Sequence, residues 1–89
     1  MEIIVNDEDD YSNYLNLIEK GEDIKILRWE NREREIPSLP NSLKELNCSY
    51  NQLTNLPLLP TGLTVLDCSN NQLTNLPSLP TILKELYCS

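Results

Sequence analysis

Apolar and polar positions alternate in short stretches that recur at a fixed distance along the chain. Leu46 and Cys48 stand between outward-pointing neighbours in residues 45–49, and Leu66 and Cys68 hold the same places 20 residues later. A period of two is typical of a strand with one buried face. The alternation therefore predicts parallel strands about 4.8 Å apart, with leucine and cysteine facing inward.

The recurring stretches belong to a longer repeat. Residues 46–65 and 66–85 are identical at 14 of 20 positions. Self-similarity at a fixed period is typical of a solenoid, in which each repeat is one coil that buries its apolar residues against its neighbours. We expect a degenerate coil over 26–45, full coils over 46–65 and 66–85, and an incomplete coil over 86–89.

Two prolines in each repeat indicate the path back to the sheet. Pro57 and Pro60, with their counterparts one repeat later, lack an amide donor and bias the preceding residue towards extended backbone. The return segments should therefore be extended or polyproline-like, not helical. Asn51 and Asn71 close the strands, and we expect their amides to bond backbone groups in the turns.

Residues 1–25 follow a different pattern. Residues 1–5 are a short apolar run that fits a strand at the edge of the solenoid. Residues 7–20 place Tyr11, Tyr14, Leu15 and Ile18 at helical spacing, with acidic residues first and glycine directly after. We expect this strand and helix to cap the first coil, because solenoid ends need covering. Binding of a partner helix is the alternative role.

The first coil allows two registers. Residues 24–29 read as a strand with Ile24 and Ile26 on one side. Asn31 falls on the position of Asn51 at a 20-residue period, whereas a shift by one residue would place Trp29 in the cysteine column. The charged run that follows is expected to be a solvated loop with ion pairs among its own residues. An interaction patch centred on Trp29 and the three nearby arginines is the alternative.

Composition narrows the possible functions. The net charge is −7, which disfavours binding to the phosphate backbone of nucleic acid. The chain shows no membrane span and no secretory leader, so we expect a cytoplasmic protein. It contains no histidine and only two glycines, which removes the usual catalytic triads and phosphate-binding loops. We expect neither an enzyme nor a cofactor.

The three cysteines occur once per repeat, at positions 48, 68 and 88. Zinc sites usually pair cysteines two to four residues apart and add further ligands, which this chain lacks. The alternation assigns the cysteines to the core, where a thiol acts as a small apolar group. Their odd number fits a reducing compartment, although parallel neighbours would bring Cys68 and Cys88 within disulfide range.

The repeat, written LxxLxCxxNxLxxLPxLPxx over 43–62 and 63–82, resembles the leucine-rich repeat. Its length and paired prolines resemble the 20-residue subclass of secreted bacterial effectors, and the wording Cys-Ser-x-Asn-Gln-Leu-Thr resembles leucine-rich repeat proteins of large DNA viruses of amoebae. The resemblance implies an α/β solenoid: a right-handed coil with a short parallel sheet on its concave face and extended segments on its convex side. For a viral protein, the location would be the host cytoplasm.

The resemblance also implies binding of a protein partner through the concave face. Tyr50 and Tyr87 are the expected anchors, because aromatic groups often dominate interface energy. The partner itself is unknown from the sequence. The candidate face comprises Glu45, Asn47, Ser49, Tyr50, Val65, Asp67, Ser69, Asn70, Glu85 and Tyr87.

The last residues suggest a second reading. Leu83, Leu86 and Cys88 would form an apolar edge that no further coil covers. Three expectations compete: a fragment of a longer array, self-association through the open C-terminal edge, and fraying. Under the first two, the chain is a structural or assembly unit with no binding activity of its own.

Overall fold

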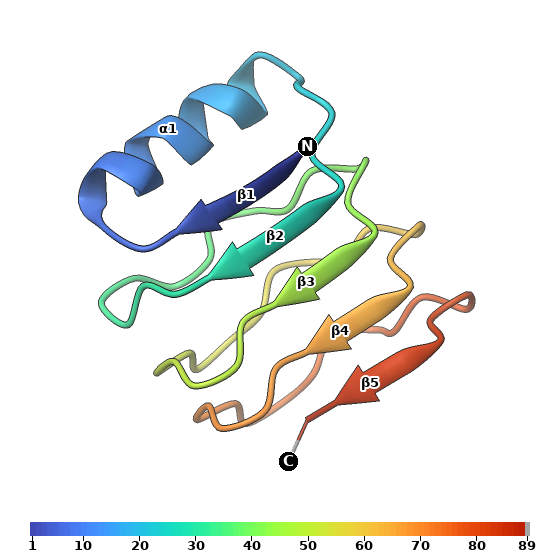
Figure 1. Ribbon diagram of the computed structural model, residues 1–89. Coiled ribbons are helices and arrows are strands. Elements are labelled where there is room, and N and C mark those ends of the chain that lie inside the picture. The colour runs from blue at the N-terminus through green and yellow to red at the C-terminus, as the bar shows by residue number, and fades with distance from the viewer. Residues whose placement is uncertain (89) are drawn as a thin grey trace.

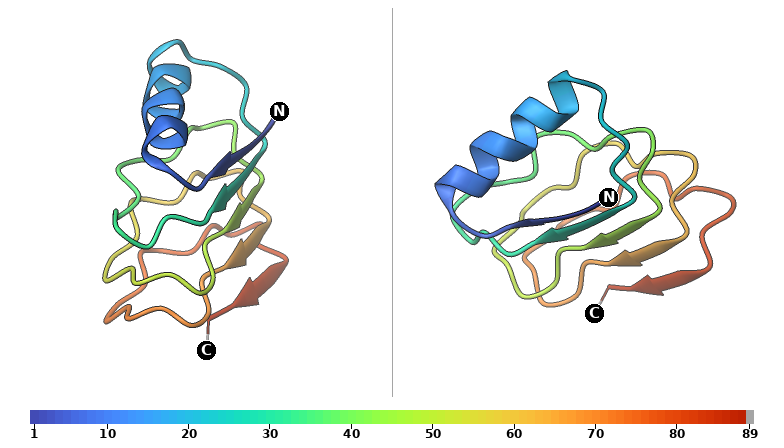
Figure 2. Two further views of the ribbon diagram at one scale, coloured as in Figure 1. Left: turned by 60° about the vertical axis from the view of Figure 1, so that its left-hand side comes forward. Right: turned by 45° about the horizontal axis from the view of Figure 1, so that its top comes forward.

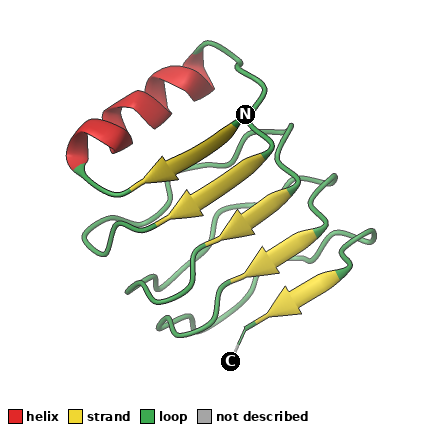
Figure 3. Ribbon diagram, in the orientation of Figure 1, coloured by secondary structure: helices red, strands yellow, loops and turns green. Residues whose placement is uncertain are grey.

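The alternating stretches form strands, and the strands join into one parallel sheet. The computed structural model describes residues 1–88, so Ser89, the end of the incomplete coil predicted over 86–89, lies outside the described residues. The strands follow chain order across the sheet and point the same way (Figures 1 and 3). The elements are β1 (Glu2–Val5), α1 (Glu8–Glu19), β2 (Ile26–Trp29), β3 (Glu45–Asn47), β4 (Val65–Asp67) and β5 (Glu85–Tyr87).

From β2 to β5 the chain returns to the sheet along segments without helix or strand in the described residues. These segments lie on one side of the sheet and leave the other side bare (Figure 2). Each return ends in the same turn, in which a leucine amide donates to the carbonyl of a proline three residues earlier at 3.2 Å. The parallel sheet and its recurring turn fit a repeat solenoid. The pairs are Leu43 with Pro40, Leu63 with Pro60, and Leu83 with Pro80.

Backbone hydrogen bonds tie each coil to the next. The Lys44 amide donates to the Lys25 carbonyl, the Thr64 amide to Lys44, and the Lys84 amide to Thr64, each at 2.8 Å. Because this register recurs, equivalent side chains form columns across the sheet. Two columns face inward and supply much of the core.

The exposed fraction of each inward leucine shows how well its coil is covered by neighbouring strands. Leu27, Leu46 and Leu66 are 0%, 1% and 0% exposed, whereas Leu86 on β5 is 38% exposed. The difference follows from position, because each inner strand has a neighbour on both sides. The second inward column holds Trp29, Cys48, Cys68 and Cys88.

The pairing of strand β2 with β3 is offset by one residue from the 20-residue period. It pairs Leu27 with Leu46, so Leu27 and Trp29 face inward and are buried. The prediction that Ile24 and Ile26 share one side of this strand is therefore wrong. Ile24 is buried before the strand begins, and Ile26 lies on the outward side.

The mismatch is a single missing residue in the turn after β2. Trp29 aligns with Cys48, whereas Asn31 keeps the 20-residue spacing to Asn51, and both asparagines are buried. The residue without a counterpart in the first coil is Tyr50, which has a φ of 58°. Each of the two registers that the sequence allowed is thus correct on one side of this turn.

Helix α1 has clear sequence signals at both ends. The Asp7 side chain accepts the Asp10 amide at 2.9 Å, and the Asp10 carboxylate accepts the Asp7 amide at 3.3 Å. This capping box satisfies amides that would otherwise lack partners at the start of the helix. Gly21 follows the helix with a φ of +70°, where a side chain would be strained.

The apolar stripe predicted for the helix is partly wrong. Tyr14 is fully buried, and Tyr11 and Ile18 pack against the core as expected. Leu15, however, is 41% exposed, and Leu17 contacts the core instead. The helix lies on the same side of the sheet as the return segments, next to β1 (Figure 2).

Trp29 joins the helix to the first coil. Its ring meets those of Tyr11 and Tyr14 edge-on, with centroid distances of 6.0 and 5.7 Å. Its Nε1 donates to the Arg34 carbonyl at 3.1 Å, and the Tyr14 hydroxyl donates to the Ser38 carbonyl at 2.6 Å. Because Trp29 is only 1% exposed, an interaction patch centred on it is ruled out.

Two of the three arginines, Arg28 and Arg34, pair with the N-terminal elements, contrary to the expectation of pairs within the charged run. Arg28 Nε lies 2.8 Å from the Glu2 carboxylate, and Arg34 binds Glu8 at 2.6 Å and stacks over Tyr11 at 4.3 Å. The hydrogen bond between Glu8 and Arg34 lowers the pKa of Glu8 and raises that of Arg34. Both pairs are exposed, so they orient segments more than they stabilise them.

The leucine column provides a test of this architecture. Leu66→Ala removes a fully buried side chain and should lower the free energy of unfolding by about 2–5 kcal/mol. Leu86→Ala, at the equivalent place on β5, should cost less than half as much, because Leu86 is partly exposed. Urea unfolding followed by circular dichroism measures both. Equal losses would mean that the end coil is as well covered as the inner ones.

Candidate functional site

One side of the sheet is free of return segments, and the side chains on that side point away from the core. We call this surface the open face: the outward residues of β1 to β5 and of the turns that follow β2, β3 and β4. No return segment crosses it, as Figures 1 and 2 both show. Strand pairing orders its residues into two rows. The first row is Glu2, Ile26, Glu45, Val65 and Glu85, and the second is Ile4, Arg28, Asn47, Asp67 and Tyr87.

The ten residues predicted for the binding face occupy two kinds of position. Six lie on the strands in the two rows: Glu45, Asn47, Val65, Asp67, Glu85 and Tyr87. The other four, Ser49, Tyr50, Ser69 and Asn70, lie in the turns directly after β3 and β4. The structure thus brings the predicted residues together on one face, and their role in binding stays a prediction.

Sequence reasoning missed the part of the open face that β1 and β2 supply. Glu2, Ile4, Ile26 and Arg28 extend both rows, and Ile4 is 48% exposed. The alternation of Val5 inward and Ile4 outward was present in the sequence. It could not be assigned, because an isolated apolar run does not reveal which of its residues will meet the core.

The two predicted serines have structural partners. The Ser49 hydroxyl donates to Asn47 Oδ1 at 3.0 Å, and the Ser69 hydroxyl donates to Asp67 Oδ1 at 2.8 Å. These side-chain bonds shape the turn after each strand. Ser49 and Ser69 are also partly buried, so they offer a partner less than their neighbours do.

The asparagines below these turns, Asn51 buried and Asn71 partly buried, also serve the fold. Asn71 Nδ2 donates to the carbonyls of Cys48, Cys68 and Ser69, and its Oδ1 accepts the Leu53 amide at 3.0 Å. Asn51 Nδ2 makes the equivalent bonds one coil earlier. These bonds satisfy strand ends that would otherwise lose about 1–3 kcal/mol each. The expected structural role of both residues is confirmed.

Tyr50 and Tyr87 are the most exposed aromatic residues of the open face, at 65% and 52%. Tyr50 occupies the left-handed region, a conformation that is uncommon for a bulky residue. Tyr87 donates its hydroxyl to Glu85 Oε1 at 3.1 Å, and this bond raises the pKa of Tyr87.

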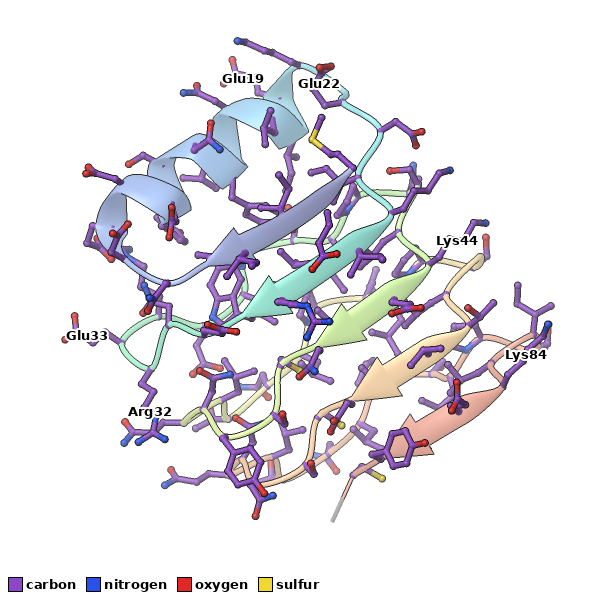
Figure 4. All side chains as sticks on the ribbon, viewed as in Figure 1. Glu19, Glu22, Arg32, Glu33, Lys44 and Lys84 are labelled. Atoms are coloured by element: carbon purple, nitrogen blue, oxygen red, sulfur yellow. The ribbon has the colours of Figure 1, made fainter. Side chains whose placement is uncertain are left out.

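A hollow of about 340 Å³ lies where β2 and β3 end, beside the turn after β2 that is one residue shorter than the later turns. Arg28, Glu30, Arg32 and Tyr50 line it. Arg32 Nε donates to the Tyr50 carbonyl at 3.1 Å, which fixes the guanidinium at the rim. Figure 4 places Arg32 at this end of the strands and Lys44 and Lys84 at the opposite end. The charge of the lining is mixed, because Glu30 lies beside the two arginines and Arg28 is already paired with Glu2.

The described residues 1–88 contain no group of three or more Cys, Asp, Glu or His side chains placed to hold a metal ion. No helix within that range has the length and apolarity needed to cross a membrane.

Comparison with known proteins supports the interpretation of the repeats. Residues 41–81 match the family model described as Leucine Rich repeats (2 copies). This segment is similar to leucine-rich repeats. The match covers slightly less than half of the chain and includes β3 and β4. No curated protein and no solved structure matches the chain. Leucine-rich repeat domains generally mediate protein–protein interaction and are typically non-enzymatic.

The Tyr87–Glu85 contact gives a titration test of the open face. Glu85→Gln weakens the hydrogen bond that Tyr87 donates to Glu85 and removes the negative charge that disfavours the phenolate, so the pKa of Tyr87 should fall towards its ordinary value. The difference between the phenolate absorbance of this variant and that of a Glu85→Gln, Tyr87→Phe double variant isolates Tyr87. Glu45→Gln, two strands away, is the control. An unchanged Tyr87 pKa in Glu85→Gln would mean that the two side chains do not meet.

Proposed function

We propose that the chain is a leucine-rich repeat module that binds a protein partner through its open face, which corresponds to the concave face of such repeats. The observation that carries this proposal is the pair of outward rows running over all five strands, uncovered by the chain's own return segments. Exposed Tyr50, Tyr87 and Ile4 supply apolar contact at separate places on the face.

The size of the face limits how a partner could bind. Five strands at a spacing of about 4.8 Å span roughly 19 Å. A face this narrow offers less area than the roughly 800 Å² that each partner contributes to a standard interface. Affinity would therefore depend on a few anchors, as is usual for aromatic residues at interfaces. Tyr50 and Tyr87 have the exposed area to serve as those anchors.

The charge of the face favours a basic partner surface. The outward rows contain Glu2, Glu45, Asp67 and Glu85 but only one cation, Arg28, which already pairs with Glu2. Opposite charges across an interface speed association and select partners, and salt weakens the attraction between these charges. The same acidic character supports the proposal that nucleic acid is not the partner.

Finer features of the predicted architecture and origin belong to this proposal. We propose a right-handed coil with an extended convex side, capped by β1 and α1 over residues 1–25. The packing of Tyr11 and Tyr14 on Trp29 supports the cap. The 20-residue subclass, a viral source and a cytoplasmic location rest on the sequence alone and stay predictions.

The anchor residues can be tested by affinity capture with the purified chain as bait. The proteins retained by the wild type should be lost with a Tyr50→Ala, Tyr87→Ala double variant. Truncating a dominant anchor costs about 2 kcal/mol, which corresponds to a roughly 30-fold weaker complex.

Leu58→Ala is the matched control, because Leu58 is 85% exposed and lies on a return segment. It should capture the same proteins as the wild type. Capture that survives the tyrosine substitutions but fails in Leu58→Ala would move the binding surface to the return side and contradict the proposal.

A second candidate function is assembly through the β5 end of the sheet. Leu76, Leu79 and Ile82 are 38%, 41% and 49% exposed, whereas Leu56 and Leu59 one coil earlier are packed against the core. Contiguous exposed apolar groups beside a strand edge are typical of an association surface. We propose that this end stacks against a further coil of the same pattern or a second copy of the chain.

Self-association at the β5 end should make the apparent mass rise with concentration in sedimentation equilibrium. Ile82→Lys places a charge in the contact and should return the chain to a monomer. Leu58→Lys adds the same charge at an exposed apolar site away from β5 and should leave the profile unchanged. A monomer at every concentration would exclude self-association through this end.

A further inference from the structure

The cysteine column places three thiols side by side. The Cys48 amide donates to the Asp67 carbonyl and the Cys68 amide donates to the Tyr87 carbonyl, both at 2.8 Å. These bonds continue the strand pairing by one residue, so Cys48 neighbours Cys68, and Cys68 neighbours Cys88. Parallel strands lie about 4.8 Å apart, and disulfides join Cα atoms that are about 4.4–6.8 Å apart. The Cα spacing of both neighbouring pairs therefore falls within the range of a disulfide.

The surroundings of the two pairs differ. Cys48 is 0% exposed and Cys68 is 2% exposed, whereas Cys88 is an exposed residue. Cys68 and Cys88 line one open cavity of about 280 Å³, together with Asn71 and Leu73, and Cys48 does not line it. A small oxidant can reach Cys88 through this cavity, and the Cys68 thiol lies next to Cys88.

We propose that Cys88 and Cys68 form a peroxide-sensitive pair that closes a disulfide between neighbouring coils. The Cys88 thiolate attacks the distal oxygen of a hydroperoxide and the O–O bond breaks. The leaving alkoxide, or hydroxide from hydrogen peroxide, takes a proton from solvent and departs as an alcohol or water. Cys88 becomes a sulfenic acid. The Cys68 sulfur then attacks the Cys88 sulfur, the S–S bond forms, and the sulfenic oxygen leaves as water with the Cys68 proton. Each disulfide consumes one hydroperoxide.

Burial explains the order of the two steps. It raises the pKa of Cys48 to about 12 and that of Cys68 to about 11, so both stay protonated at neutral pH. The thiolate is the form that reacts with peroxide. Oxidation therefore begins at the exposed Cys88, and Cys68 takes part only after the sulfenic acid has formed next to it.

The disulfide would join β4 to β5 through the residues directly after these strands. Strand β5 is the least covered part of the sheet, since all three of its residues are exposed. A covalent link to the better-buried β4 coil would slow its local opening. Oxidising conditions would then rigidify the end of the sheet at which the second candidate function places assembly.

Peptide mapping of the full chain tests the proposal. The reduced protein is treated with a small excess of hydrogen peroxide, digested with trypsin without reductant and examined by mass spectrometry. Cleavage after Lys44 and Lys84 places Cys48 and Cys68 in one peptide, residues 45–84, and Cys88 in another, residues 85–89. The wild type should give these two peptides linked by one disulfide.

Alanine variants then assign the partner of Cys88. Cys48→Ala should keep the link, and Cys68→Ala should lose it and accumulate Cys88 sulfenic acid, which a dimedone probe traps. Cys88→Ala should lose the link and leave Cys68 reduced. Because Cys88 is exposed, this last variant keeps the fold even where Cys68→Ala weakens it.

Three results would overturn the proposal. One is a link that survives Cys68→Ala but is lost in Cys48→Ala. Another is a wild type in which Cys88 proceeds to sulfinic acid with no link. The third is a link found only between two copies of the chain, recognised by the doubled mass of the undigested protein.

Discussion

The repeated backbone register between coils is the constraint on which the rest of the structure depends. A coil of 20 residues has no second layer of its own, so its inward leucines become buried only where another strand lies on each side. Leu46 and Leu66 meet this condition and are almost fully buried, and Leu86 does not. The same amide-to-carbonyl bond recurs at Lys44, Thr64 and Lys84 and holds the columns in line. Stability is therefore a property of neighbouring coils rather than of any single one.

The first coil satisfies this register with a different set of residues. The loss of one turn residue brings Trp29 into the column that later coils fill with cysteine. An indole is far larger than a thiol, and the extra volume meets Tyr11 and Tyr14 of α1. The shorter turn and the large Trp29 side chain thus give the first coil a surface on which the helix packs.

The period of the sequence was enough to predict the parallel strands, the inward leucine and cysteine columns and six of the outward residues. It was not enough for the first coil, because a deleted turn residue shifts the pattern on one side only, and Trp29 and Asn31 gave conflicting registers. Leu15 and Leu17 both fit a broad helical stripe, and only packing decides between them. Ion pairs such as Arg34 with Glu8 join segments whose proximity no local pattern reveals.

The repeats also allow a comparison within one chain. From β3 onward, inward positions hold the same residue from coil to coil, as Leu46 and Leu66 do, because they fill the same space. Outward positions change in chemistry, from Glu45 to Val65 to Glu85 along one row, since the register does not constrain them. Tyr50 goes further: it has a φ of 58°, a backbone region that costs a non-glycine residue of the order of 1 kcal/mol, and Asn70 tolerates it better. An exposed aromatic residue kept at an energetic cost, beside a hollow with two arginines, contributes nothing visible to the core, and this supports a role in recognition.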